Sequence, residues 1–520
     1  EVIMIDGRLL TEKIVTYAKL HLHLGALDEV YVRNSLLFEL KLEDPLDADE
    51  VPDLSYIADL KVPDSIYSEI KQYAVENNIA EEPYADIYAT YIMGLVSPRP
   101  SDVNNVFNTL KERLGPQSAC SYLFDLSIKN NYIQKTAIDR NILWEYKDGN
   151  NKLEITINLS KPEKDNKDIA KLLQATAQKS KKYPKCLLCR ENEGFKGTLT
   201  HPARGNLRII SLKLAGEEWF MQYSPYQYYE EHCIVFGKHV PMSINRKTIE
   251  KLCDFIELFP NYFIGSNADL PIVGGSILNH EHFQGGKHLM PMHHAGVIKE
   301  FKSEEYPDVE VGLLDWYNTV IHLTGFNRNT VVALAGDIIE KWENYSDESA
   351  NIIGKTADGV RHNTVTPSVR FTDDNRYCID LILRNNMTSE QYPDGIYHAH
   401  PEYHNIKKEG IGLIEAMGLY ILPGRLKKQM SDIQDILTKK VAYDRDSIFT
   451  EGNPLYVHRY MIDVLVKQHP VVNSAEEAQQ ITTDYINHVC AKILDNTSVY
   501  KKDAEGNLAL TRFLDTLGIK

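Results

Sequence analysis

Apolar residues recur at three- and four-residue spacing along the N-terminal third of the chain, which is the pattern of amphipathic helices. Turn-forming residues separate these segments, as in Ser97-Pro98-Arg99-Pro100 and Asp148-Gly149-Asn150. We therefore expect residues 1–180 to form a mostly helical extension, with a further helix in the charged, lysine-rich junction at 159–185. The clearest stretches predict helices at 9–24, 64–77, 83–94 and 103–114.

The pattern changes after residue 185, where short runs of β-type residues lie between turn signals. An amphipathic helix interrupts them at about 245–258, beginning near Ser243 and ending before Pro260. The first β-rich passage has runs at 207–214, 219–223, 232–236, 262–264 and 276–283. A second passage has runs at 309–323, 330–335, 368–371 and 377–384.

Each β-rich passage ends in a His-x-His pair, which suggests a duplicated unit. His280 and His282 end the first, and His398 and His400 end the second, 118 residues later (280 to 398). The repeat is weak by sequence because other features do not keep this spacing. The last segment, 411–520, is again largely helical.

Composition and charge narrow the class of protein. The chain is 43% apolar and 25% charged, as in soluble globular proteins. Its net charge of −16 argues against a general nucleic-acid binder, although donors in a site can still bind an anionic nucleotide. Seven cysteines, with one close pair, are no disulfide framework. No signal-peptide pattern or membrane-length apolar run occurs, so we expect a cytoplasmic protein without a membrane segment.

The stretch His280-Glu281-His282-Phe283-Gln284 is the strongest candidate for chemistry. In an extended strand, two imidazoles and one carboxamide would share a face, just after Gly274-Gly275, where a backbone can approach a ligand closely. This combination suits a phosphate, because an imidazole can act as nucleophile or metal ligand and an amide can donate to a phosphoryl oxygen. The alternative is a histidine pair on a polar strand face without a function.

Within this stretch, His282 is the candidate nucleophile. Attack by a neutral imidazole splits one displacement at phosphorus into two easier steps. Gln284 has no useful acid or base function, so positioning the phosphoryl oxygens is its natural role. Asn267 lies upstream at a turn; it can hold another oxygen of the phosphate, or only cap the backbone.

Cys186 and Cys189 have the spacing of a chelating pair. Zinc commonly takes four nitrogen or sulfur ligands, and His239 and His280 are candidates for the other two. The local sequence equally allows two unrelated buried cysteines, and a redox pair is a further alternative.

Other candidates are weaker. His398, His400 and His404 can form a second metal site or contact a substrate, or they can end a strand in a non-catalytic half. Arg204 and Arg208 can clamp a phosphate or lie on a solvated surface. The sequence contains no P-loop, GxGxxG or GxSxG motif.

Together, these residues resemble the galactose-1-phosphate (hexose-1-phosphate) uridylyltransferases, a branch of the histidine triad superfamily with His-x-His-x-Gln. The likeness is closest to the longer bacterial type, which has an N-terminal extension. It covers roughly residues 183–426. Several motifs in the expected order, here called anchors, identify the family more specifically than any single motif does. The anchors are the Cys186–Cys189 pair, His239, Asn267, the block 274–284 and the block 397–426.

The resemblance implies residue roles. Cys186, Cys189, His239 and His280 match the ligands of a structural Zn²⁺, His282 matches the uridylylated histidine, and Gln284 the glutamine that orients the phosphoryl group. His398 and His400 match a pair that serves a second metal and the substrate in the better-known branch. The glutamate that completes the second metal site in that branch has no clear match after Gln284, so the resemblance implies no complete second site here. The sequence also differs from the better-known branch at Glu281 and Phe283, where that branch has proline and glycine. Further candidate substrate contacts are Asn267, Ser276 and Arg204.

The resemblance further implies an α+β fold, with two tandem histidine-triad-like antiparallel sheet units after the helical extension. We expect domains at 1–180, 181–305 and 306–520. The implied activity is ping-pong transfer of UMP from UDP-glucose to galactose 1-phosphate, in galactose metabolism, by a homodimer. UDP-galactose and other hexose 1-phosphates are the related partners. The alternatives are a nucleotidyltransferase or phosphorylase of dinucleoside polyphosphates, and a non-enzymatic zinc-stabilised nucleotide-binding module.

Overall fold

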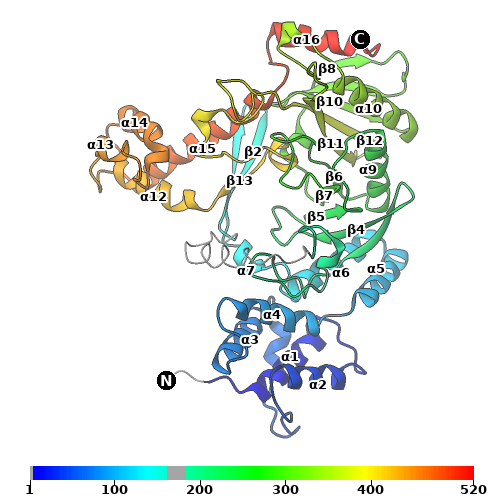
Figure 1. Cartoon of the computed structure of the whole chain (residues 1–520), viewed down its shortest axis with the longest axis vertical. Helices are drawn as coiled ribbons and strands as arrows, with labels where there is room; N and C mark the ends of the chain where they lie inside the picture. Colours follow the sequence, from blue (N-terminus) through cyan, green and yellow to red (C-terminus); the bar gives the residue numbers. More distant parts are fainter. Residues whose placement is uncertain (1–3, 161–182) are drawn as a thin grey trace. The chain divides into compact units, whose positions relative to one another are not determined.

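The computed structural model describes residues 4–160 and 183–520 (Figure 1). Contacts between these residues divide them into two compact units. Among the described residues, the first unit comprises 4–140, 183–240 and 280–287, and the second comprises the rest. Each unit is defined by contacts in space, and each combines several separate stretches of the chain. The division at 1–180, 181–305 and 306–520 stays a prediction. The helix expected within 159–185 falls largely on 161–182, outside the described residues.

Helices begin the first unit, and the four predicted there are confirmed. Asp6 caps the first of them, accepting hydrogen bonds from the backbone N–H groups of Arg8 and Leu9. α5 and α6 pack on each other, and α5 also packs on β3. The helices are α1 (Gly7–His21), α2 (Glu29–Glu39), α3 (Asp64–Glu76), α4 (Tyr84–Leu95), α5 (Pro100–Leu114), α6 (Pro116–Lys129) and α7 (Lys135–Ile138), with short 3₁₀ turns at Ser55–Asp59 and Arg190–Asn192.

Four antiparallel strands complete the first unit, in the order β3-β4-β5-β7. They are β3 (Ile210–Leu214), β4 (Glu217–Tyr223), β5 (Cys233–Phe236) and β7 (His282–Gly286). β7 is shorter and later than the predicted strand 276–283, and His280 lies just before it. In the β5–β7 register, His282 pairs with Phe236 and Gln284 with Ile234. His282 and Gln284 therefore share one face of β7, as their spacing predicted.

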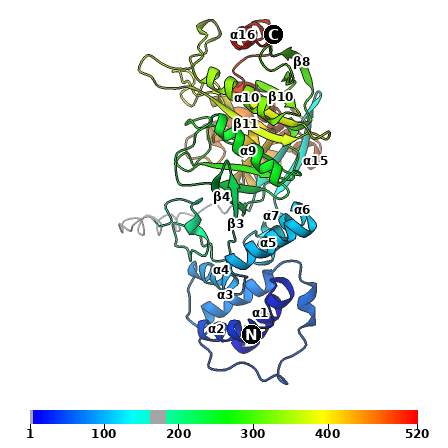
Figure 2. The same cartoon turned by 90° about the vertical axis from the view of Figure 1, so that its right-hand side faces the viewer.

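The second unit contains an antiparallel sheet in the order β6-β11-β12-β10-β9-β8. Figure 2 shows α9 and α10 in front of this sheet, and both helices pack on its strands. The strands are β6 (Phe263–Gly265), β8 (Val297–Lys302), β9 (Glu310–Leu314), β10 (Val320–Gly325), β11 (Asn363–Phe371) and β12 (Tyr377–Asn385). The helices are α9 (Arg246–Leu258) and α10 (Arg328–Glu343), with 3₁₀ turns at Pro291–His294, Glu348–Ala350 and Pro401–Tyr403.

A three-stranded sheet and the C-terminal helices complete this unit. β1 (Ile142–Asp148) and β2 (Asn151–Asn158) form a hairpin, and β13 (Leu419–Pro423) pairs with β2 in parallel. The helices are α11 (Leu413–Ala416), α12 (Arg425–Leu437), α13 (Arg445–Ile448), α14 (Arg459–Gln468), α15 (Ala475–Thr497) and α16 (Ala504–Asp515), with a 3₁₀ turn at Tyr456–His458. Within the described residues, none of the helices has the length and apolar character that crossing a bilayer needs.

The α+β class is confirmed, but one predicted strand is wrong. The run 330–335 lies in α10 and not in a strand. Its β-branched residues favour a strand locally, yet burial at Val331, Leu334, Ala335 and Ile338 follows helical spacing. The hairpin β1–β2 is the strand-forming exception within the described part of the extension that was expected to be mostly helical. Its two-residue loop is Gly149-Asn150, and glycine suits the first loop position because its φ is 60°.

Candidate active site and metal centre

Two cysteines and two histidines converge in the first unit, as the sequence predicted. The Cys186 sulfur lies 3.5 Å from that of Cys189, 3.7 Å from Nδ1 of His239 and 3.2 Å from Nδ1 of His280. The Cys189 sulfur lies 3.1 Å and 3.8 Å from the same two nitrogens. Buried Asn192 braces the cysteine turn by donating to the carbonyls of Cys186 and Cys189. His239 follows β5 and His280 precedes β7, so the cluster ties three chain segments together.

The donor atoms of this cluster fit a tetrahedral metal ion. Zinc bonds of about 2.3 Å to sulfur and 2.0–2.1 Å to nitrogen place neighbouring donors roughly 3.3–3.8 Å apart. The Nε2–H of His280 donates to the carbonyl of Gly237 at 2.9 Å, which leaves its Nδ1 lone pair facing the sulfurs. Burial and the adjacent Cys186 raise the pKa of the Cys189 thiol to about 11. A divalent cation would allow both sulfurs to be thiolates.

The ring of His282 is oriented by the backbone. Its Nδ1–H donates to the carbonyl of His280 at 2.8 Å, so Nε2 carries the lone pair. His282 is 7% exposed, and burial lowers its pKa to about 4. On the opposite face of β7, Phe283 stacks on Trp219 with ring centres 4.8 Å apart and planes at 7°. This stack anchors the strand that carries a neutral, oriented imidazole.

Gln284 has a partner that the sequence analysis missed. Nε2 of His232 lies 3.0 Å from Oε1 of Gln284. His232 is 2% exposed and immediately precedes β5, the strand beside β7. No local spacing connects two residues that are 52 positions apart, so only strand pairing could reveal this contact.

Asn267 and Ser276 lie in the second unit and differ in their surroundings. Asn267 is buried, and its Oδ1 accepts the backbone N–H of Leu413 at 2.8 Å. A Cβ at Gly275 would lie 2.6 Å from Nδ2 of Asn267, so glycine is required for this close approach. Asn267 therefore holds the backbone at Leu413, which is one of the two roles expected for it. Ser276 is exposed in the loop before β7.

His398 and His400 also lie in the second unit, outside its strands. Nε2 of buried His398 accepts the backbone N–H of Ile411 at 3.2 Å, and its Nδ1 has no partner among the described residues. The Nε2–H of His400 donates to the carbonyl of Ile396 at 2.9 Å, and its ring stacks on Tyr392. Within the described part of the chain, neither histidine belongs to a group of three or more potential metal ligands.

The two candidate arginines behave differently. Arg208 is buried, and its guanidinium donates to backbone carbonyls of Pro98, Gly205 and Gly94. The interpretation of Arg208 as a solvated surface residue is therefore wrong, because its side chain is buried. The phosphate clamp stays a prediction, although these carbonyls already use most of its donors. Arg204 is half-buried; it donates to the carbonyl of Ala203 and lies over the ring of Tyr132.

Comparison with known proteins identifies the family. A model described as the N-terminal domain of galactose-1-phosphate uridyl transferase matches residues 30–241, and the model of its C-terminal domain matches 255–447. A galactose-1-phosphate uridylyltransferase of Caldanaerobacter subterraneus subsp. tengcongensis is 43% identical over 99% of both chains. The chain belongs to the galactose-1-phosphate uridylyltransferase family.

Further relatives carry the same description. A galactose-1-phosphate uridylyltransferase of Clostridium acetobutylicum is 44% identical over 94% of this chain and 96% of its own. That of Halalkalibacterium halodurans is 41% identical over 97% and 98%. No solved structure matches the chain. The suspected resemblance to this family is confirmed, and the likeness extends through the helical N-terminal residues.

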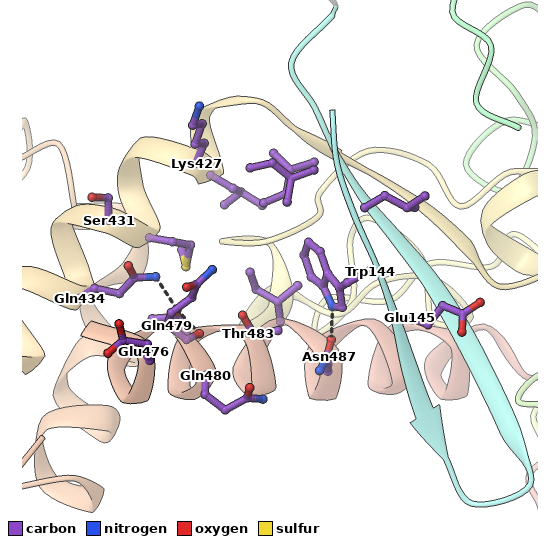
Figure 3. Close-up of a pocket in the computed structure, with 17 residues that line it drawn as sticks. Trp144, Glu145, Lys427, Ser431, Gln434, Glu476, Gln479, Gln480, Thr483 and Asn487 are labelled. Carbon is purple, nitrogen blue, oxygen red and sulfur yellow. Dashed lines mark hydrogen bonds between the residues drawn. The ribbon is translucent and has the colours of Figure 1, made fainter. Parts of the chain in front are cut away.

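Two further features of this family member lie outside the predicted site. A groove of about 790 Å³ lies between β1, α12 and α15, where the Trp144 indole donates to Asn487 at 2.7 Å (Figure 3). Among the described residues that line the groove, none carries an imidazole or a thiol. His322, Cys378 and Asp380 form a second group of potential metal ligands. However, Nδ1 of His322 and Oδ1 of Asp380 are 2.6 Å apart, closer than the roughly 3.3 Å between two ligands of one tetrahedral ion. This contact is that of an ion pair.

Proposed function

We propose that this chain transfers UMP from UDP-glucose to galactose 1-phosphate through a covalent adduct on His282. The orientation of the imidazole carries the proposal. Because Nδ1–H is held by the carbonyl of His280, the Nε2 lone pair is the one available for attack on phosphorus. The family membership supports the same reaction.

The bond changes balance without an acid catalyst. Nε2 of His282 forms a bond to the α-phosphorus of UDP-glucose, and the bond from that phosphorus to the bridging oxygen breaks. Glucose 1-phosphate leaves as a stable phosphate anion, so no proton has to be delivered to it. A phosphate oxygen of galactose 1-phosphate then attacks the same phosphorus, and the nitrogen–phosphorus bond breaks. We assign Gln284 to hold the phosphoryl oxygens in both steps, because it lies on the same face of β7.

We propose zinc as the metal of the cluster, with Cys186, Cys189, His239 and His280 as ligands. Two sulfurs and two imidazole nitrogens are a donor set that zinc favours. Its contribution would be to fix the backbone. The side chain of His280 joins the cluster while its carbonyl orients His282. The metal would therefore position the nucleophile, and the histidine performs the chemistry.

We further propose that the protein is a cytoplasmic homodimer. We propose Asn267, Ser276, His398, His400 and Arg204 as contacts to the nucleotide or sugar phosphates. Among them, His398 has the clearest support. Its Nε2 accepts a hydrogen bond, so its proton lies on Nδ1, and that buried atom has no partner among the described residues. A substrate oxygen would satisfy it. A second metal at His398 and His400 lacks comparable support.

Labelled UDP-glucose tests this function. With the label in the uridine, the protein should acquire an acid-labile, base-stable label and release glucose 1-phosphate. Galactose 1-phosphate should then remove the label as UDP-galactose. A labelled dinucleoside polyphosphate tests the alternative nucleotidyltransferase. A protein with that activity would acquire its label from this substrate and not from UDP-glucose. Nucleotide binding without any covalent label would identify a non-enzymatic module and contradict the proposal.

A further inference from the structure

His232 is a buried histidine whose two ring nitrogens have different partners. The backbone N–H of Tyr228 points to Nδ1 at 3.4 Å, and Nε2 lies 3.0 Å from Oε1 of Gln284. The rings of Tyr229 and Tyr228 pack against the imidazole, with ring centres 4.4 Å and 5.5 Å away. The ring is therefore fixed on both its edges and its faces.

These contacts determine which nitrogen carries the proton. An N–H donor at Nδ1 requires a lone pair there, so the proton of the neutral ring lies on Nε2. Burial lowers the pKa of His232 to about 4, which keeps the ring neutral near pH 7. An imidazolium would instead place two N–H groups against each other at Nδ1. Nε2–H is therefore a donor directed at the amide oxygen of Gln284.

A carboxamide has two chemically opposite ends, and this donor distinguishes them. With Oε1 bound to His232, the NH₂ group of Gln284 must occupy the other end. Reversal of the amide would place NH₂ against Nε2–H and an oxygen toward the phosphate, and both contacts are repulsive. We propose that His232 is a positioning residue that holds the NH₂ group of Gln284 toward the phosphoryl oxygens. This inference rests on the proposed role of Gln284 in UMP transfer.

The loop that carries His232 is held to β7. The hydroxyl of Tyr229 donates to the carbonyl of Gly285 at 3.1 Å. Glu231 has a φ of 52°, in the left-handed region that non-glycine residues rarely adopt. A Cβ at Gly286 would lie 2.7 Å from the Tyr229 ring and 2.8 Å from the carbonyl oxygen of Glu231, so glycine permits the close approach. This loop conformation places His232 opposite Gln284.

A double-mutant cycle with Gln284→Ala tests the inference. His232→Phe keeps a ring but removes the donor, and it should slow both half-reactions roughly 5- to 50-fold through the unpaired amide oxygen. In the Gln284→Ala background, the same substitution should change the rates by less than about 2-fold. Equal slowing in both backgrounds would show that His232 does not act through Gln284, and it would overturn the inference. His232→Gln retains an N–H donor and should restore part of the rate only where Gln284 is present.

His458 provides a matched control. It is fully buried, its Nε2 lies 2.9 Å from Oε1 of Gln429, and burial lowers its pKa to about 4. His458→Phe removes the same kind of histidine–glutamine contact, so it should lower stability without slowing either half-reaction. If His232→Phe does not fold, His232→Asn carries the same cycle, because its side chain is too short to reach Gln284. Failure of the wild-type protein to form any adduct would contradict the proposed function, whereas an additive cycle in an active protein contradicts only the role of His232.

Discussion

The carbonyl oxygen of His280 accepts the Nδ1–H of His282 at 2.8 Å, while the imidazole of His280 itself faces Cys186 in the cysteine–histidine cluster. One residue therefore serves the cluster with its side chain and the candidate nucleophile with its backbone.

The first prediction concerns this nucleophile, His282. His282→Ala should retain less than a few per cent of the transfer rate, because no other nucleophile is proposed for the phosphorus. Turnover and covalent labelling are measured together, with zinc content as the check on folding. An active, labelled variant would assign the nucleophile elsewhere.

The second prediction concerns the metal. The purified protein should contain close to one zinc per chain, and Cys186→Ser should reduce that content and the melting temperature, because the cluster ties three chain segments together. Cys490→Ala is the control, since Cys490 is buried in α15 and outside the cluster. It should keep the zinc. Active protein without stoichiometric metal, unaffected by chelators, would refute the assignment.

The third prediction separates a transferase from a hydrolase through Gln284. Its uncharged amide cannot deliver a proton, so the adduct on His282 should persist in buffer until a sugar phosphate arrives. Gln284→Ala should slow both half-reactions by roughly 10²–10³-fold if the amide acts like an oxyanion-hole donor. The lifetime of the labelled protein is compared with and without galactose 1-phosphate. Rapid release of free UMP in buffer alone would indicate a hydrolase.

The fourth prediction concerns the dependence of stability on pH at the His322–Asp380 ion pair. Burial opposes the charge on His322, but the adjacent Asp380 carboxylate outweighs it and raises the pKa of His322 to about 10. Burial likewise opposes ionisation of Asp380, yet His322 keeps that pKa below its usual range. The contribution of His322 is therefore complete below its unfolded pKa of about 6.5 and is lost as the pH rises toward 10.

Urea unfolding of the wild type and His322→Gln tests this pH dependence. The wild type should be the more stable at pH 6, and its advantage should shrink steadily up to pH 9.5. An advantage that is the same at both pH values would mean that His322 is not charged in the folded protein. The parallel His458→Phe variant should show no such narrowing, because burial already keeps His458 neutral.

Local sequence was sufficient for much of the fold. Helical spacing located α1, α3, α4, α5 and α9, because an amphipathic face can be read within a few turns. It failed at 330–335, where β-branched residues dominate a short window but the buried face of α10 extends to Trp342. It also missed the hairpin β1–β2, whose outer strand is largely exposed and therefore lacks a clear apolar alternation. Packing decided both segments.

The sequence by itself determined the reactive groups. The order of Cys186, Cys189, His239, His280, His282 and Gln284 was enough to indicate the family and the cluster of potential metal ligands. Only the tertiary structure decided how these groups are oriented. A backbone carbonyl determines which nitrogen of His282 is free, and His232, just before the neighbouring strand, orients the amide of Gln284. The guanidinium of Arg208 donates to backbone carbonyls. Spacing along the chain states which side chains are available, whereas hydrogen bonds between distant segments fix their protons and directions.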